Sequence, residues 1–160
     1  MHATRIDLSQ SVRQKVISLL QARLADSLDL KLSVKQAHWN VKGPGFIQLH
    51  ELFDDIAGRA EDLADGLAER ITSLGGTALG RVQQVAQQTT LAAYPDDLSQ
   101  GPAHVAALAD RIAAVAKGTR AAITACSEAG DEVTADLFNE TTGILDKDLW
   151  LLEAHLQSPA

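Results

Sequence analysis

The sequence predicts an all-α protein built as a four-helix bundle, for three reasons. Alanine and leucine dominate and aromatic residues make up only 4% of the chain, a composition that favours helices over sheets. Apolar residues recur at helical spacing in four long stretches, and none of the four prolines interrupts one of them. With 160 residues the chain can bury a sizeable core, so we expect residues 1–160 to form a single domain.

Turn-forming residues mark the ends of these stretches, namely Gly43, Pro44, Gly75, Gly76 and Gly130. Between these ends, the spacing of the apolar residues predicts long helices over residues 7–39, 46–74, 102–128 and 131–156. The connection between the second and third helices is long. It can hold one short helix near residues 81–89 and can cross the bundle from one end to the other.

Charge and cysteine content narrow the functional classes. The net charge is −7 and the pI is near 5.1, which argues against a generally basic nucleic-acid-binding surface and suits a protein that attracts cations. No apolar run is long enough to span a bilayer, and the N-terminus lacks an export signal pattern. The single cysteine, Cys126, excludes an internal disulfide framework and is expected to be a small buried hydrophobe. We therefore expect a cytoplasmic location, with nucleoid association as a further option.

The helix expected at residues 46–74 carries a polar stripe. On a helical wheel at about 100° per residue, its apolar residues occupy one arc of roughly 100°. That arc holds Leu49, Leu52, Phe53, Ile56, Ala60, Leu63, Leu67, Ile71 and Leu74. A second arc, centred roughly 155° away, holds His50, Asp54, Asp65 and Glu69. These four side chains are expected to point away from the core of their own chain.

Two interpretations of this stripe are open. A run of charges is most often a solvated helix face. Against that, His50 lies one helical turn from Asp54, so the two side chains can converge on one ion. The same is true of Asp65 and Glu69. A metal site is the sharper hypothesis, because imidazole combined with carboxylate suits iron, zinc or manganese.

The spacing between the two pairs favours a site shared by two chains. Asp54 and Asp65 are eleven residues apart, or about 16 Å along a helix axis, so one helix cannot bring both pairs to one ion. If two copies of the helix lie antiparallel across a twofold axis, residue n faces residue 119 − n. His50 of one copy would therefore face Glu69 of the other, and Asp54 would face Asp65, because each pair of residue numbers adds up to 119. Gly58 would permit close backbone approach near the axis.

A di-iron centre inside the bundle fits the sequence poorly. Such centres use Glu-x-x-His pairs on inward helix faces, and no glutamate stands three residues before any of the five histidines. Three of those histidines have no partner pattern and stay unassigned, namely His2, His104 and His155.

Three segments resemble the Dps family, the bacterial mini-ferritins. They read KQAHWNVKGPGFIQLHELFDDIAGRAEDLADGLAERITSLGG, YPDD and DEVTADLFNETTGILDKDLWLLEAHL. The resemblance covers nearly the whole chain and matches ligand types, spacings and bounding glycines together. It implies a single ferritin-like four-helix bundle with a short helix in the long connection between the second and third helices.

The resemblance also implies a function and its residues. Dps proteins form dodecameric hollow shells with ferroxidase sites at the twofold interfaces, where Fe(II) is oxidised and then stored inside as a ferric mineral. Carried over by position, the iron ligands are His38, His50 and Asp54 of one chain with Asp65 and Glu69 of its partner. Zinc is a second candidate metal for the same site. His38 is assigned through the resemblance alone, because a lone histidine at such a position is more often a packing residue.

Further roles are implied outside the ligand set. Trp39 resembles the family tryptophan thought to intercept stray oxidising equivalents, with interface packing as the alternative, whereas Trp150 is expected in the core. Asp131, Asp136 and Glu140 resemble the acidic residues of the family's threefold iron-entry pores, where a ring of carboxylates would concentrate cations. Capping of the following helix is the alternative for Asp131.

The two ends of the chain depart from DNA-binding members of the family, which use mobile lysine-rich tails. Residues 1–12 contain one arginine and no lysine, and the last ten residues contain neither. We therefore predict weak or absent DNA binding, because affinity for the phosphate backbone depends on lysine and arginine contacts.

The leading hypothesis is a ferroxidase that stores iron and protects against oxidative stress, with hydrogen peroxide as the preferred oxidant and O2 as another. Glu51 and Asp55 are either mineral-nucleating or simply solvated carboxylates. Two alternatives come from other classes, a DNA-compacting nucleoid protein and a passive shell that sequesters divalent metals such as zinc without turnover.

Overall fold

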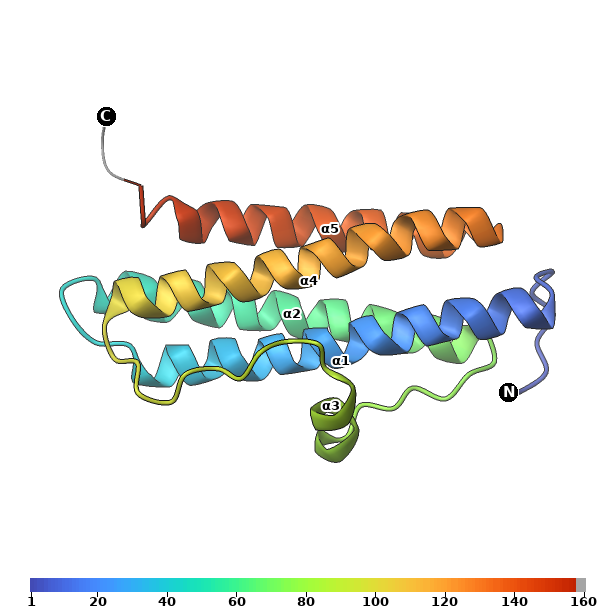
Figure 1. Ribbon diagram of the computed structural model, residues 1–160, viewed down its shortest axis with the longest axis horizontal. Coiled ribbons are helices and arrows are strands. Elements are labelled where there is room, and N and C mark those ends of the chain that lie inside the picture. The colour runs from blue at the N-terminus through green and yellow to red at the C-terminus, as the bar shows by residue number, and fades with distance from the viewer. Residues whose placement is uncertain (158–160) are drawn as a thin grey trace.

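The computed structural model describes residues 1–157 and confirms the all-α prediction. Five helices form within that range: α1 (Gln10–Asn40), α2 (Phe46–Ser73), α3 (Val82–Gln88), α4 (Gly101–Ala129) and α5 (Glu132–Glu153). The four long helices lie side by side as a bundle, and the short α3 sits outside it (Figure 1). The predicted α1 began three residues too early, because Ser9 caps this helix by accepting a hydrogen bond from the backbone N–H of Val12.

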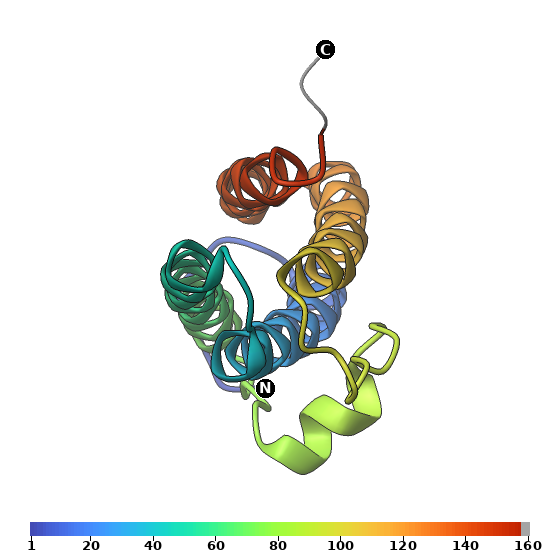
Figure 2. The ribbon, with the colours of Figure 1, turned by 90° about the vertical axis from the view of Figure 1, so that its left-hand side faces the viewer.

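The bundle consists of two antiparallel helix pairs, α1 with α2 and α4 with α5, which are visible end-on in Figure 2. The connection from α2 to α4 returns along the bundle and carries α3 on the way, so that α4 runs in the same direction as α2 (Figure 1). This is the predicted crossover. No helix among residues 1–157 combines the length and apolar character that crossing a bilayer requires.

The core is formed by the apolar faces of all four long helices. Seven of the nine apolar residues assigned to the α2 face are buried, and Leu52 and Leu63 are partly buried. Cys126 is buried as predicted, and this burial raises the pKa of its thiol to about 11, which leaves it a poor nucleophile. The prediction for Trp150 was wrong, since this side chain is 61% exposed on α5.

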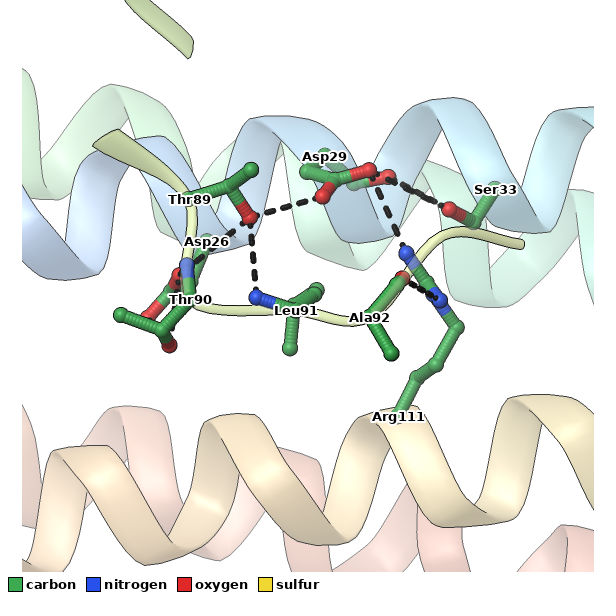
Figure 3. Close-up of polar contacts among 8 residues, drawn as sticks. All are labelled: Asp26, Asp29, Ser33, Thr89, Thr90, Leu91, Ala92 and Arg111. Carbon is green, nitrogen blue, oxygen red and sulfur yellow. Dashed lines mark hydrogen bonds and ion pairs between the residues drawn. The ribbon is translucent and has the colours of Figure 1, made fainter. Parts of the chain in front are cut away.

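A polar network ties the crossover connection to the bundle (Figure 3). Asp26 of α1 is fully buried and accepts hydrogen bonds from the backbone N–H of Thr90, at 2.7 Å, and from its hydroxyl. Asp29, one turn later, accepts from the Thr89 hydroxyl at 2.7 Å and pairs with Arg111 of α4. Arg111 also donates to a backbone carbonyl of the connection. Because these hydrogen bonds and the ion pair join α1, the connection and α4, the segment carrying α3 is held in one position on α1.

Two ion pairs join α2 to α5. Arg59 approaches Asp148 at 2.7 Å, and Arg70 donates to both carboxylate oxygens of Asp131 at 2.9 and 3.1 Å. Asp131 also accepts from the backbone N–H of Thr134 and so caps α5, which confirms the capping alternative. Burial raises the pKa of the Asp148 carboxyl, although its bond to Arg59 acts in the opposite direction.

Candidate metal centre

The turn between α1 and α2 brings two of the predicted ligands together. Gly43 in this turn adopts a φ of 111°, which suits glycine, and the chain reverses so that the end of α1 lies beside the start of α2. The rings of His38 and His50 consequently stack with their centroids 3.7 Å apart and an interplanar angle of 19°. The hairpin therefore brings together two histidines that are twelve residues apart in the sequence.

The two histidines are fixed by reciprocal hydrogen bonds to the backbone. Nδ1 of His38 lies 2.7 Å from the carbonyl oxygen of His50, and Nδ1 of His50 lies 2.9 Å from the carbonyl oxygen of His38. A carbonyl oxygen can only accept, so Nδ1 carries the proton in both rings. In the neutral form of each ring, Nε2 then keeps its lone pair, which is the arrangement found in histidines that bind metals.

Asp54 lies one turn beyond His50 on the exposed surface of α2, with 55% of its side chain accessible. Its Oδ1 is 2.6 Å from Nζ of Lys35, which projects from α1. The hydrogen bond from Lys35 is the main cause that lowers the pKa of the Asp54 carboxyl, and His38 and His50 act in the same direction when their rings are protonated. This carboxylate is therefore ionised at neutral pH, and it is held by Lys35 one helical turn from His50.

Asp65 and Glu69 occupy the same exposed side of α2 further along the helix. Because α2 is continuous from Phe46 to Ser73, Asp54 and Asp65 are about 16 Å apart along its axis. Within residues 1–157 of a single chain, no three histidine, cysteine, aspartate or glutamate side chains form a metal-binding group. One chain thus presents two separated half-sites, which we name the histidine half-site (His38, His50 and Asp54) and the carboxylate half-site (Asp65 and Glu69).

Exposed apolar side chains surround the histidine half-site. Trp39, next to His38, is 67% exposed, and Nζ of Lys35 lies 5.8 Å from the centroid of its ring. Phe46 and Ile47 at the start of α2 are also exposed, and the Phe46 ring centroid lies 5.1 Å from that of His50. Large exposed aromatic side chains close to polar groups are typical of protein–protein interfaces.

The predicted pore residues divide into two groups. Asp136 and Glu140 are exposed and lie one turn apart on α5, so their carboxylates remain available for the predicted pore. Asp131 is only 2% exposed and is fully engaged with Arg70 and Thr134. Within one chain the Asp131 carboxylate is therefore occupied by the cap and the ion pair, and a role for it in a pore stays a prediction.

Two features near the site were missed at the level of sequence. The first is Lys35, which contacts Asp54. It lies on α1 three residues before His38, so a helical wheel of the second helix alone did not include it. The second is His104, which is buried with Nδ1 only 2.7 Å from the Tyr94 hydroxyl and whose pKa is lowered by burial. His104 therefore belongs to the core rather than to the metal centre.

Comparison with known proteins agrees with the fold. Residues 17–159 match the family model described as a ferritin-like domain. The DNA protection during starvation protein of Agrobacterium fabrum is 47% identical over 98% of this chain and 96% of its own length. The corresponding Mycolicibacterium smegmatis protein is 36% identical, covering 94% and 82% of the two chains.

Solved structures of Dps proteins also superpose closely on this chain. Mycobacterium smegmatis Dps superposes with a TM-score of 0.95 at 34% identity, over 100% of this chain and 91% of that one. DpsC from Streptomyces coelicolor has a TM-score of 0.94 at 30% identity, over 99% and 92%. Dps from Microbacterium arborescens, in a structure described as the high iron form, has a TM-score of 0.89 at 35% identity, over 96% and 99%. This chain belongs to the Dps family of ferritin-like proteins.

Proposed function

We propose that this protein oxidises Fe(II) and stores the Fe(III) product, using sites that form between two copies of the chain. The observation that carries the proposal is the histidine half-site, in which backbone carbonyls hold both rings through Nδ1 and an ionised carboxylate lies one helical turn from His50. Iron is the substrate here, and a set of imidazole and carboxylate ligands suits it. Zinc would be a competitor for the same ligands.

A second copy would complete the site. In the antiparallel arrangement of two α2 helices, His50 and Asp54 of one chain face Glu69 and Asp65 of the other, which gives two equivalent sites about one twofold axis. The exposed Trp39, Phe46 and Ile47 would be buried by the same contact. Burial of this apolar surface supplies a driving force for dimerisation that does not depend on metal.

The chemistry follows from the electron count. Two Fe(II) ions lose one electron each, while one hydrogen peroxide molecule takes up these two electrons and two protons and becomes two molecules of water. No hydroxyl radical is released when both electrons arrive together, which is why we propose peroxide as the preferred oxidant. Trp39 follows His38 in the sequence and is exposed, so it would be a side chain able to supply an electron if only one iron ion were present.

Storage requires a closed shell, and we propose a dodecamer. Asp136 and Glu140 would line its iron-entry pores, where carboxylates gathered around a threefold axis would raise the local concentration of Fe(II). The exposed Glu51 and Asp55 of α2 would then lie on the inner wall and bind the first ferric ions.

Mixing two inactive variants tests the shared site. One chain carries His50→Ala with Asp54→Ala, and the other carries Asp65→Ala with Glu69→Ala. Each alone should lack ferroxidase activity. A mixed dimer places the intact histidine half-site opposite the intact carboxylate half-site at one of its two positions, so random pairing should restore about a quarter of wild-type activity. The two chains are unfolded together and refolded. The initial rate of Fe(II) oxidation by peroxide then measures the restored activity.

The control is each variant refolded alone under the same conditions, and co-assembly is verified by carrying different affinity tags on the two chains. Activity that stays at the level of the single variants in a verified mixed assembly would contradict the shared site. A passive metal-sequestering shell makes a different prediction, because wild-type protein would then bind Fe(II) without accelerating its oxidation.

DNA binding is expected to be weak even though the curated relatives are named for DNA protection. The net charge of −7 should repel the phosphate backbone. In a mobility-shift assay at physiological salt with a chelator present, linear DNA should migrate as free DNA at micromolar protein. Retention of the DNA under these conditions would favour the alternative of a nucleoid-compacting protein.

A further inference from the structure

The ion pair between Lys35 and Asp54 places a cation on a proposed iron ligand. Nζ lies 2.6 Å from Oδ1, and the Lys35 side chain is 26% exposed, so its aliphatic part is packed while its ammonium group reaches the carboxylate. Its approach to the Trp39 ring, at 5.8 Å from the centroid, places the same ammonium group at the exposed edge of the histidine half-site.

Lys35 matters for the charge balance of the proposed interface between two chains. In the antiparallel arrangement Asp54 of one chain faces Asp65 of the other, with Glu69 one turn away. Three carboxylates would then converge at each site, and like charges placed opposite one another across an interface oppose association. The histidines are neutral when Nε2 is free. The positive charge that the chain itself places against this cluster is therefore that of Lys35, through its contact with Asp54.

We propose that Lys35 is a built-in counter-cation of the twofold site, which allows two chains to associate without metal and gives up Asp54 when a divalent ion binds. The inference rests on the proposed shared site. Lys35 is then a positioning residue outside the ligand set, and its bond to Asp54 lowers the affinity of the site for a divalent ion. The ammonium group and a metal ion compete for the same oxygen, and the divalent ion prevails because it carries twice the charge and can bind imidazole and carboxylate ligands of both chains at once.

The chain offers a closely matched control for this role. Lys31 lies one turn earlier on α1 and forms an ion pair with Glu61 of α2 at 2.7 Å. The exposure of this pair, 29% for the lysine and 63% for the glutamate, is close to that of Lys35 and Asp54, which are 26% and 55% exposed. In the antiparallel arrangement Glu61 faces Gly58, so no carboxylate of the partner stands opposite it.

The experiment compares wild-type protein with Lys35→Met, Lys35→Arg and Lys31→Met. Sedimentation velocity over a dilution series measures assembly in the presence of EDTA and again with Co(II), and isothermal titration measures Co(II) binding. Lys35→Met should need on the order of tenfold more protein to assemble in EDTA, and Co(II) should restore assembly. It should bind Co(II) about fivefold tighter, or about 1 kcal/mol at 1.4 kcal/mol per factor of ten. Lys35→Arg and Lys31→Met should match wild type.

The inference is overturned if Lys35→Met assembles in EDTA at the wild-type concentration, or if its Co(II) affinity is unchanged or weaker. An equal effect of Lys31→Met would also overturn it, since loss of any surface cation would then suffice. His50→Ala separates failure of the proposed function from failure of this inference. If His50→Ala binds Co(II) as tightly as wild type, the metal site itself is wrong. Circular dichroism verifies folding, and Lys35→Gln replaces Lys35→Met if the latter loses helix.

Discussion

Replacing His50 and Asp54 together by alanine is expected to slow peroxide-driven oxidation of Fe(II) by about a hundredfold or more. Loss of groups that merely orient a metal ligand costs about 10- to 100-fold in affinity or activity, and this variant removes two ligands outright. The change also removes the hydrogen bond from His50 Nδ1 to the His38 carbonyl, so the remaining histidine loses part of its support. Stopped-flow absorbance of the ferric product, after anaerobic Fe(II) is mixed with peroxide, gives the rate.

A matched variant separates loss of ligands from loss of polar surface. Gln48 and Asp62 are exposed on α2 but lie outside the stripe that carries the ligands, so Gln48→Ala with Asp62→Ala should keep the wild-type rate. Circular dichroism and sedimentation velocity would verify that both double variants fold and assemble. A ligand variant that assembles and oxidises iron at the wild-type rate would rule out the assignment of this site.

Replacing Arg70 by methionine is expected to lower the free energy of unfolding by about 3–5 kcal/mol, the usual cost of leaving one partner of a buried ion pair uncompensated. The Asp131 side chain is only 1% exposed, and Arg70 donates to both of its oxygens. Asp131 also caps α5, so its unpaired charge would remain inside the junction between α2 and α5 rather than turn to solvent. Urea unfolding followed by circular dichroism, at one fixed protein concentration, measures the change.

The control for this prediction is the ion pair of Arg120 with Asp146. It also joins neighbouring helices, but its side chains are 52% and 46% exposed. Arg120→Met should therefore cost less than about 1 kcal/mol, as exposed ion pairs usually do. If the two substitutions proved equally mild, Asp131 would have to be more accessible to water than its 1% exposure indicates.

Helix periodicity was sufficient to predict most of the fold. The apolar spacing and the glycines at the turns located the four long helices, because a helix that packs on one side repeats its buried face every three to four residues. The error at Trp150 came from relying on residue type instead of position. Leu145 and Leu152 define the buried face of α5, and Trp150 lies about 160° from Leu152 on the helical wheel. Applied to α5, the same wheel argument predicts the exposure that the structure has.

Contacts between distant segments could not be predicted in this way. The network of Asp26, Asp29 and Arg111 joins residues that are 60 or more positions apart, and helical spacing carries no information about such pairs. The pairing of Lys35 with Asp54 likewise depends on how the α1–α2 hairpin aligns its two helices. The stacking of His38 on His50 has the same origin. Sequence therefore indicated the ligand types, whereas their orientation needed the fold.

The reciprocal bonds between the two histidines and the backbone also bear on when the chain can become active. The His38 carbonyl lies in the last turn of α1, where it lacks a partner in its own helix, and the His50 ring supplies the hydrogen bond. The histidines are thus oriented as soon as the hairpin closes, in a single newly made chain. The proposed site still lacks its carboxylates at that stage. A dilute, unassembled subunit would therefore hold iron too weakly to catalyse its oxidation, and activity would rise with the square of the subunit concentration until the shell has formed.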